Sequence, residues 1–254
     1  MRLLIDFLCR FGWGLSAALL ITPAALVPAG FFRVNMLVVL GLATFAALLS
    51  GQALPAYGWL LPATAAVIAW MASIAWFAER IRPGRLLCAV AAVLLAAATA
   101  VVQITPGGSG MMGMMGTAGV AAALLSGLVT GLTVHAMLLG HWYLNAPGMR
   151  VDVLRSMIDA AFVVWGIQLF LVVAAAIAAS NVAVASEPMA VGSTTTALLS
   201  LRWLAGLAGL PVLLWMSRKT LEIPNTQSAT GILYVACLAA ILGELTAQLL
   251  SATA

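Results

Sequence analysis

The chain contains very few charged residues. Only 7% of its 254 residues are Asp, Glu, Lys or Arg, whereas 64% are hydrophobic. Soluble domains carry about 25% charged residues, so this composition excludes a soluble fold. At the centre of a membrane helix an ionisable side chain costs roughly 2.5 to 3.5 kcal/mol. Each charged residue inside an apolar stretch therefore needs a partner or a function.

Cysteine and histidine are scarce as well. Cys9, Cys88 and Cys237 lie far apart in apolar stretches without CxxC spacing, which favours core packing over a disulfide or a zinc site. The two histidines, His135 and His141, are six residues apart. On a helix this spacing turns them about 120° from each other, so one helix cannot present both to one metal ion or one haem. We predict no metal site.

Long apolar runs make up most of the chain. A transmembrane helix needs about 20 mostly apolar residues, and the strands of a membrane barrel would be shorter and alternating. The sequence therefore predicts an all-α polytopic membrane protein, one bundle of about eight transmembrane helices with short loops. The expected spans are residues 3–27, 32–49, 57–77, 86–104, 117–144, 153–179, 194–216 and 228–250.

Basic residues gather in alternate loops. Short cytoplasmic loops carry an excess of Arg and Lys, so both termini are expected on the non-cytoplasmic side of a membrane such as the bacterial inner membrane. Topology then accounts for the net charge of +4, and we expect no nucleic-acid partner. The loops after the first, third, fifth and seventh spans hold Arg33, Arg80, Arg82, Arg85, Arg150, Arg155, Arg218 and Lys219.

Two segments allow a second interpretation. The first 30 residues have the pattern of a cleaved signal peptide, but cleavage would invert every later loop against the distribution of basic residues. A tandem Met-Met-Gly between Met111 and Gly116, which includes Met115, offers thioethers that suit Cu(I). Methionine also fills irregular gaps, so packing of this exterior loop is favoured over copper binding.

One group of polar residues is expected near the non-cytoplasmic face. Arg202 and Glu244 both lie about 10 to 12 Å deep at 1.5 Å per residue, which predicts an ion pair. Asp6 and Arg10 share a face of the first span at a similar depth, and Gln248 is one turn from Glu244. These residues either lock the spans together or form a proton or ion pathway in which Glu244 titrates.

A second group is expected near the cytoplasmic face. The fifth span ends with His135, His141, Trp142 and Tyr143, and Asp159 of the sixth span lies at the depth of His141. An Asp often orients a His, so we predict a His141–Asp159 pair. His135 and Trp142, seven residues apart, share a helix face. Alternatively, the residues 141–143 anchor the helix at the membrane interface.

The loop after the seventh span faces this second group. Asn225, Thr226 and Gln227 crowd before a helix start, where free backbone N–H groups can hold an anion or a carbonyl oxygen. Arg218 and Lys219 strengthen that tendency. One such residue is enough to cap a helix, so the excess predicts a ligand-facing segment.

The second group favours a redox function. Quinone carbonyls need a protonatable His, an N–H donor and an aromatic wall, so we expect a pocket for a quinone or haem b near the cytoplasmic face. Eight spans with little mass outside the membrane suit a non-catalytic subunit whose membrane or peripheral partner proteins carry the cofactors. The helix count is similar to that of quinone-handling subunits of molybdenum and iron–sulfur enzyme complexes, an analogy of architecture alone.

Other functions remain open. Gln168, in the middle of the sixth span, could link the two polar groups of a proton-coupled small-solute transporter, or simply hydrogen-bond to another helix. A structural or assembly subunit would bind no ligand. A lipid-modifying enzyme would use His141 as a base, with Arg218 and Lys219 on a head-group phosphate.

Overall fold

The computed structural model describes residues 1–53, 57–105, 113–146, 148–183, 193–223 and 225–253, and these residues form helices and short connections without a strand. Eight helical stretches in them are long and apolar enough to cross a membrane, which confirms the predicted number and suggests a multi-pass membrane protein. The elements are α1 (Arg2–Ile21), α2 (Ala29–Ala53), α3 (Leu60–Phe77), α4 (Ile81–Ile104), α5 (Gly113–Asn145), α6 (Val151–Ala183), α7 (Ser193–Leu201), the π-helix η1 (Arg202–Gly209), α8 (Leu210–Thr220) and α9 (Thr226–Thr253).

Two helix boundaries differ from the sequence expectation for a clear reason. α1 ends at Ile21 instead of continuing to residue 27, because Pro23 lacks an N–H group and disfavours helical backbone in the residue before it. α4 begins at Ile81, five residues before the expected start at residue 86. Its first turn accommodates Pro83, since the N–H groups of a first turn have no partner inside the helix.

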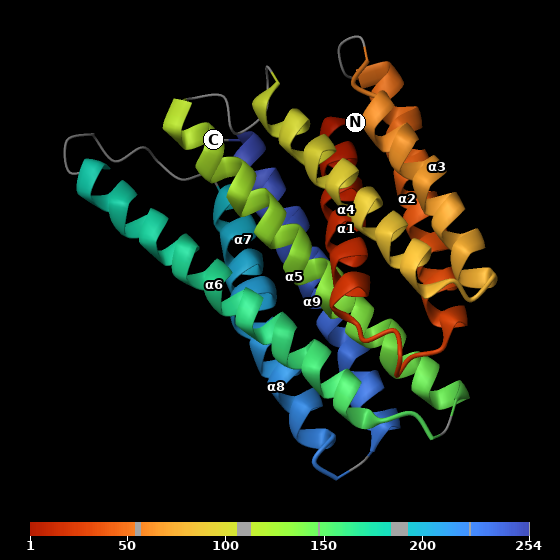
Figure 1. The fold of residues 1–254 in the computed structure, drawn as a ribbon. Coiled ribbons are helices and arrows are strands. Elements are labelled where there is room, and N and C mark those ends of the chain that lie inside the picture. The colour runs from red at the N-terminus through yellow and green to blue at the C-terminus, as the bar shows by residue number, and fades with distance from the viewer. Residues whose placement is uncertain (54–56, 106–112, 147, 184–192, 224, 254) are drawn as a thin grey trace.

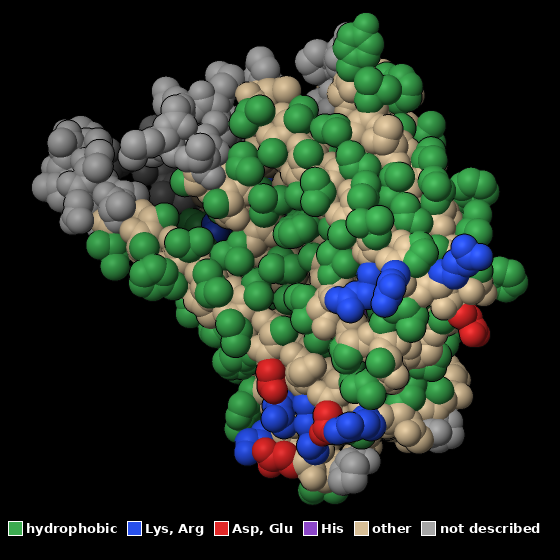
Figure 2. Space-filling model, viewed as in Figure 1, with side chains coloured by type: hydrophobic (Ala, Val, Ile, Leu, Met, Phe, Trp, Pro, Cys, Tyr) green, Lys and Arg blue, Asp and Glu red, His purple; other side chains and the backbone are tan. Residues whose placement is uncertain are grey.

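The ends of the bundle differ in charge. α1 begins and α9 ends at the same end, called here the terminus end (Figure 1). The connections that carry the basic loop residues lie at the opposite end, called here the basic end. Figure 2 shows most of the Lys, Arg, Asp and Glu side chains of this face toward the basic end, and many hydrophobic side chains on the rest of it.

α1 and α5 approach each other closely through glycines. A Cβ added at Gly14 would lie 1.9 Å from the carbonyl oxygen of Gly127, and one at Gly131 would lie 2.1 Å from the carbonyl carbon of Gly14. Small residues let two helix backbones come this close in a membrane bundle. The contact places Arg10 of α1 directly against α5, where a Cβ on Gly127 would meet the Arg10 carbonyl oxygen at 2.5 Å.

α6 lies at the edge of the bundle. In its most apolar window 6% of the residues are buried, against 67% for α5. α6 contacts α5 and the basic-end half of the seventh span, α8, and runs outward toward the terminus end (Figure 1). A cavity lies between this outward half of α6 and the neighbouring helices.

Candidate ligand-binding cavity

A buried ion-pair network lies near the terminus end. Arg10 Nη2 lies 2.5 Å from Asp6 Oδ2, and Arg10 Nη1 lies 2.8 Å from Glu244 Oε1. The three residues are 5%, 7% and 4% exposed in the order Asp6, Arg10 and Glu244. The Asp6–Arg10 pair follows from their i, i+4 spacing on α1. Glu244 comes from α9, so this network ties the first span to the last.

Neutral donors complete the contacts of both carboxylates. Gln248 Nε2 donates to Glu244 Oε1 at 2.7 Å, and Gln103 Nε2 donates to Asp6 Oδ2 at 2.9 Å. The hydroxyl of Ser126 donates to Glu244 Oε2. Burying a charge is tolerated when it is both paired and hydrogen-bonded, and each of these carboxylates meets that condition.

Arg202 departs from its predicted role. The sequence predicted an Arg202–Glu244 ion pair, but Glu244 pairs with Arg10, and Arg202 forms no ion pair in the described part of the chain. Equal depth along two helices does not decide which face a side chain occupies. Arg202 opens the π-helical segment η1, where the turn is wider than in an α-helix.

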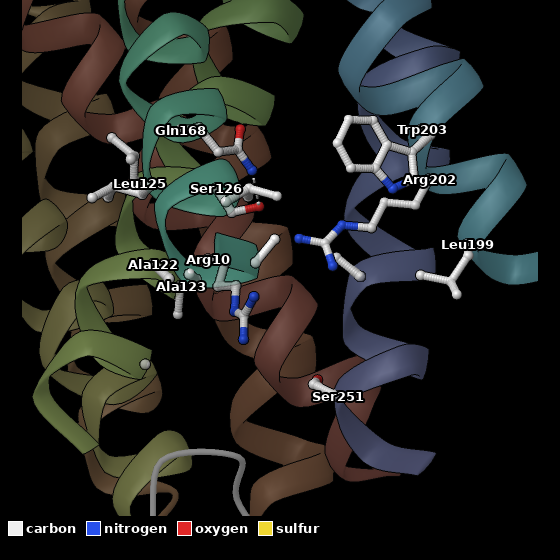
Figure 3. A pocket seen from close by; sticks show the side chains of 16 residues that line it. Arg10, Ala122, Ala123, Leu125, Ser126, Gln168, Leu199, Arg202, Trp203 and Ser251 are labelled. Atoms are coloured by element: carbon white, nitrogen blue, oxygen red, sulfur yellow. Dashed lines mark hydrogen bonds between the residues drawn. The ribbon is translucent and has the colours of Figure 1, made fainter. Parts of the chain in front are cut away.

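The Arg202 side chain instead faces a cavity of about 510 Å³ between α5, α6, the seventh span and α9. Figure 3 shows its guanidinium pointing inward, with Arg10 below and Ser126 and Gln168 opposite. Gln168 Nε2 donates to Ser126 Oγ at 3.2 Å, which confirms Gln168 as an interhelical hydrogen-bonding residue. The other lining residues are mainly apolar and include Leu125, Leu171, Val172, Leu199 and Trp203.

The polar groups of the cavity continue into the ion-pair network. Gln168 contacts Ser126, Ser126 contacts Glu244, and Glu244 contacts Arg10. This series of contacts crosses from α6 through α5 and α9 to α1. The cavity thus combines a few hydrogen-bonding groups with apolar walls, an arrangement suited to a ligand with both polar and apolar parts.

His135 belongs to the packed interior and does not line this cavity. Its side chain is fully buried, and Nε2 lies 2.7 Å from Thr22 Oγ1. The Phe31 ring lies 5.3 Å from the His135 ring and 5.7 Å from the Trp142 ring, between centroids. The shared contact confirms that His135 and Trp142 occupy one helix face.

The predicted His141–Asp159 pair is wrong. His141 Nδ1 lies 3.1 Å from the hydroxyl of Tyr234 on α9, and Asp159 Oδ1 accepts a hydrogen bond from Arg218 Nε at 2.8 Å. The reason is the packing of α6, which brings Asp159 to α8, whereas His141 faces α9. The two residues therefore reach similar positions along the bundle but contact different neighbours.

Two residues of the predicted ligand-facing loop, Asn225 and Lys219, form side-chain contacts with the α8–α9 connection or the first turn of α9. Asn225 Oδ1 accepts from the backbone N–H of Ser228 at 3.0 Å and so caps α9, and Lys219 Nζ lies 2.9 Å from Glu222 Oε1. Gln227 is exposed. The predicted basic-end residues that do not line the cavity are His135, His141, Trp142, Tyr143, Asp159, Arg218, Lys219, Asn225, Thr226 and Gln227.

Several residues of the site were missed by sequence reasoning. Ser126 and Gln103 lie inside apolar helices, where a serine commonly bonds to its own backbone, so nothing in the sequence singled them out. Trp203 was equally inconspicuous among the eight tryptophans. Of the predicted Met-Met-Gly motif, Met111 and the side chain of Met115 lie outside the described residues.

No protein-family model matches the chain, and comparisons with curated proteins and with solved structures give no match. The decisive features are an amide, a hydroxyl and a guanidinium that has no carboxylate partner among the described residues, beside apolar walls.

Proposed function

We propose that the chain is an integral membrane subunit of a redox or energy-converting complex, and that it binds a quinone in the cavity beside Arg202. The supporting observation is that the Arg202 guanidinium faces Gln168 and Ser126 across an apolar-walled cavity of about 510 Å³. Ligand sites typically measure about 300 to 1,000 Å³. A quinone has carbonyl oxygens that accept hydrogen bonds, and its ring and tail are apolar.

The proposed site lies at the opposite end from the one that the sequence favoured. His141 and Asp159 contact separate neighbours, whereas the terminus-end residues converge on a cavity. If the basic end faces the cytoplasm, as the positive-inside rule predicts, the quinone binds toward the other face of a membrane such as the bacterial inner membrane. Partner subunits would carry the haem or other redox centres that exchange electrons with it.

Quinone binding is tested with the purified chain and a short-tailed ubiquinone analogue. We expect saturable quenching of tryptophan fluorescence, since Trp203 lines the cavity, and a smaller quench in Trp203→Phe. Arg202→Gln should weaken binding about tenfold or more, because a hydrogen bond from a charged donor contributes about 1.5 to 3 kcal/mol. Arg218→Gln, at the basic end, serves as the matched control. Equal affinity in the two variants would refute the assignment.

One observation favours a second function, proton-coupled transport of a small anion. Arg202 has no carboxylate partner in the described residues, while Glu244 lies one contact away from the cavity through Ser126. An anion bound at Arg202 could move together with a proton on Glu244. Uptake of a small carboxylate into liposomes, driven by a pH gradient and lost in Glu244→Gln, would support transport instead of quinone binding.

A further inference from the structure

Four exposed arginines lie at the basic end of the bundle. Arg33 near the start of α2 and Arg80, Arg82 and Arg85 at the start of α4 are all exposed. None of them takes part in an ion pair in the part of the chain that the structure describes. Glu79 is next to Arg80 in sequence and also forms no ion pair there. We call these four residues the arginine surface.

Contacts between the helix ends bring the arginine surface together. The Arg33 guanidinium lies 4.5 Å from the centroid of the Phe77 ring, at the end of α3. Arg85 Nη2 donates to the carbonyl oxygen of Leu20 near the end of α1 at 3.2 Å. The ends of α1 and α3 and the starts of α2 and α4 therefore meet here, and Figure 2 shows Lys and Arg side chains toward this end of the bundle.

The other four basic residues of this end each contact a carboxylate. Arg218 contacts Asp159, Lys219 contacts Glu222, and Asp152 contacts the remaining two, Arg150 and Arg155. Membrane orientation would explain why all eight basic residues lie at one end, but it would not explain why, among the described residues, only four of them contact carboxylates. The excess positive charge is concentrated on the arginine surface.

Exposed apolar side chains continue from the arginine surface along α4. Leu86 is four residues after Arg82 and is 65% exposed, and Val93, on the same helix face, is 66% exposed. Phe77, under Arg33, is 68% exposed. A molecule held by the guanidiniums would find apolar surface directly below them, in the direction of the membrane interior.

We propose that the arginine surface binds the head group of an anionic phospholipid, with the acyl chains along the exposed face of α4. Guanidinium groups bind phosphate oxygens in a bidentate geometry, and the apolar stripe matches the tails. An acidic protein partner would be held by the cations alone and would give the exposed Leu86 and Val93 no role in binding. The inference is independent of quinone binding, which concerns the other end of the bundle.

The test uses the full chain, purified and titrated in mixed micelles with phosphatidylglycerol or phosphatidylcholine. We expect a preference for phosphatidylglycerol that falls as salt is raised. Arg80→Gln/Arg82→Gln should weaken phosphatidylglycerol binding about 25-fold, since each basic residue near anionic lipid contributes about fivefold. Neither side chain makes a hydrogen bond in the described structure, so the bundle should keep its thermal stability. Arg150→Gln/Arg155→Gln is the matched control at the same end.

Four results would overturn the proposal. The first is equal affinity for the two lipids, and the second is an equal loss in the control variant. The third is displacement of phosphatidylglycerol by millimolar inorganic phosphate, which would make this a phosphate site. If the double variant does not fold, Arg82→Gln alone and the salt dependence of the unaltered chain test the same inference. Loss of a co-purifying acidic subunit with lipid binding unchanged would assign the surface to a protein.

Discussion

The molecule contains two arginine–carboxylate contacts of equal length in opposite surroundings. Arg10 and Glu244 near the terminus end, and Arg218 and Asp159 at the basic end, both lie 2.8 Å apart. The side chains of the first pair are 9% and 1% exposed, and those of the second are 35% and 53% exposed. The distance therefore says little about what each contact contributes to stability. The contribution to stability depends instead on solvent access, because water and salt screen the charges of the exposed pair.

The largest effect is expected from Arg10→Ala. This change leaves Asp6 and Glu244 buried close to each other without a cation, and breaking a buried pair costs about 3 to 5 kcal/mol. We expect a clear drop in the thermal unfolding temperature, followed by circular dichroism in a mild detergent.

A triple variant serves as the control for Arg10→Ala. Asp6→Asn, Arg10→Met and Glu244→Gln together remove all three charges while keeping similar volumes. Replacing a buried ion pair by uncharged residues is often close to neutral, so this variant should unfold well above Arg10→Ala. If the triple variant is as unstable as the single one, packing rather than charge explains the loss.

The second effect concerns the helix contact that holds Arg10 in place. In Gly127→Ala the new Cβ would lie 2.5 Å from the Arg10 carbonyl oxygen, so α1 and α5 must separate. Overpacking of this kind costs typically about 1 to 3 kcal/mol. Gly166→Ala on α6 is the matched control, because its Cβ would meet nothing within 4 Å. A Gly127→Ala protein as stable as the control would contradict the close contact.

The sequence allowed the helix count and the Asp6–Arg10 pair to be predicted, because hydropathy and i, i+4 spacing are local properties. It could not supply the direction in which each side chain faces. Arg202 and Glu244 share a depth, yet Glu244 pairs with Arg10; His141 and Asp159 also share a depth, yet they contact different helices. The partner that each side chain contacts depends on the close Gly14–Gly127 contact and on the position of α6, and both are properties of the packed bundle.

The third prediction concerns the exposed pair. Asp159→Asn removes the acceptor of Arg218 but leaves both side chains in contact with solvent. Exposed ion pairs contribute about 0 to 1 kcal/mol, so the unfolding temperature should hardly change. The same measurement as for Arg10→Ala checks it. A loss comparable to that of Arg10→Ala would mean that a lipid or partner subunit covers this pair in the assembled protein.

The smallest effect is expected for pH at the α8–α9 connection. The hydrogen bond from Lys219 lowers the pKa of Glu222 below its ordinary value. A carboxyl whose pKa is lowered by folding stabilises the protein above its unfolded pKa, and that contribution disappears as the pH falls through the folded pKa. Both side chains are more than half exposed, at 53% and 54%, so screening should make the contribution too small to detect.

Glu222→Gln checks this expectation through unfolding temperatures measured from pH 7 down to pH 3. The curve should parallel that of the unaltered chain, because water and salt screen this exposed pair. Should Glu222→Gln visibly reduce the acid sensitivity, the Lys219–Glu222 contact would have to be shielded from solvent. In that case this contact would be covered by a lipid or a partner subunit in the assembled protein, and exposure in the single chain would not predict its contribution to stability.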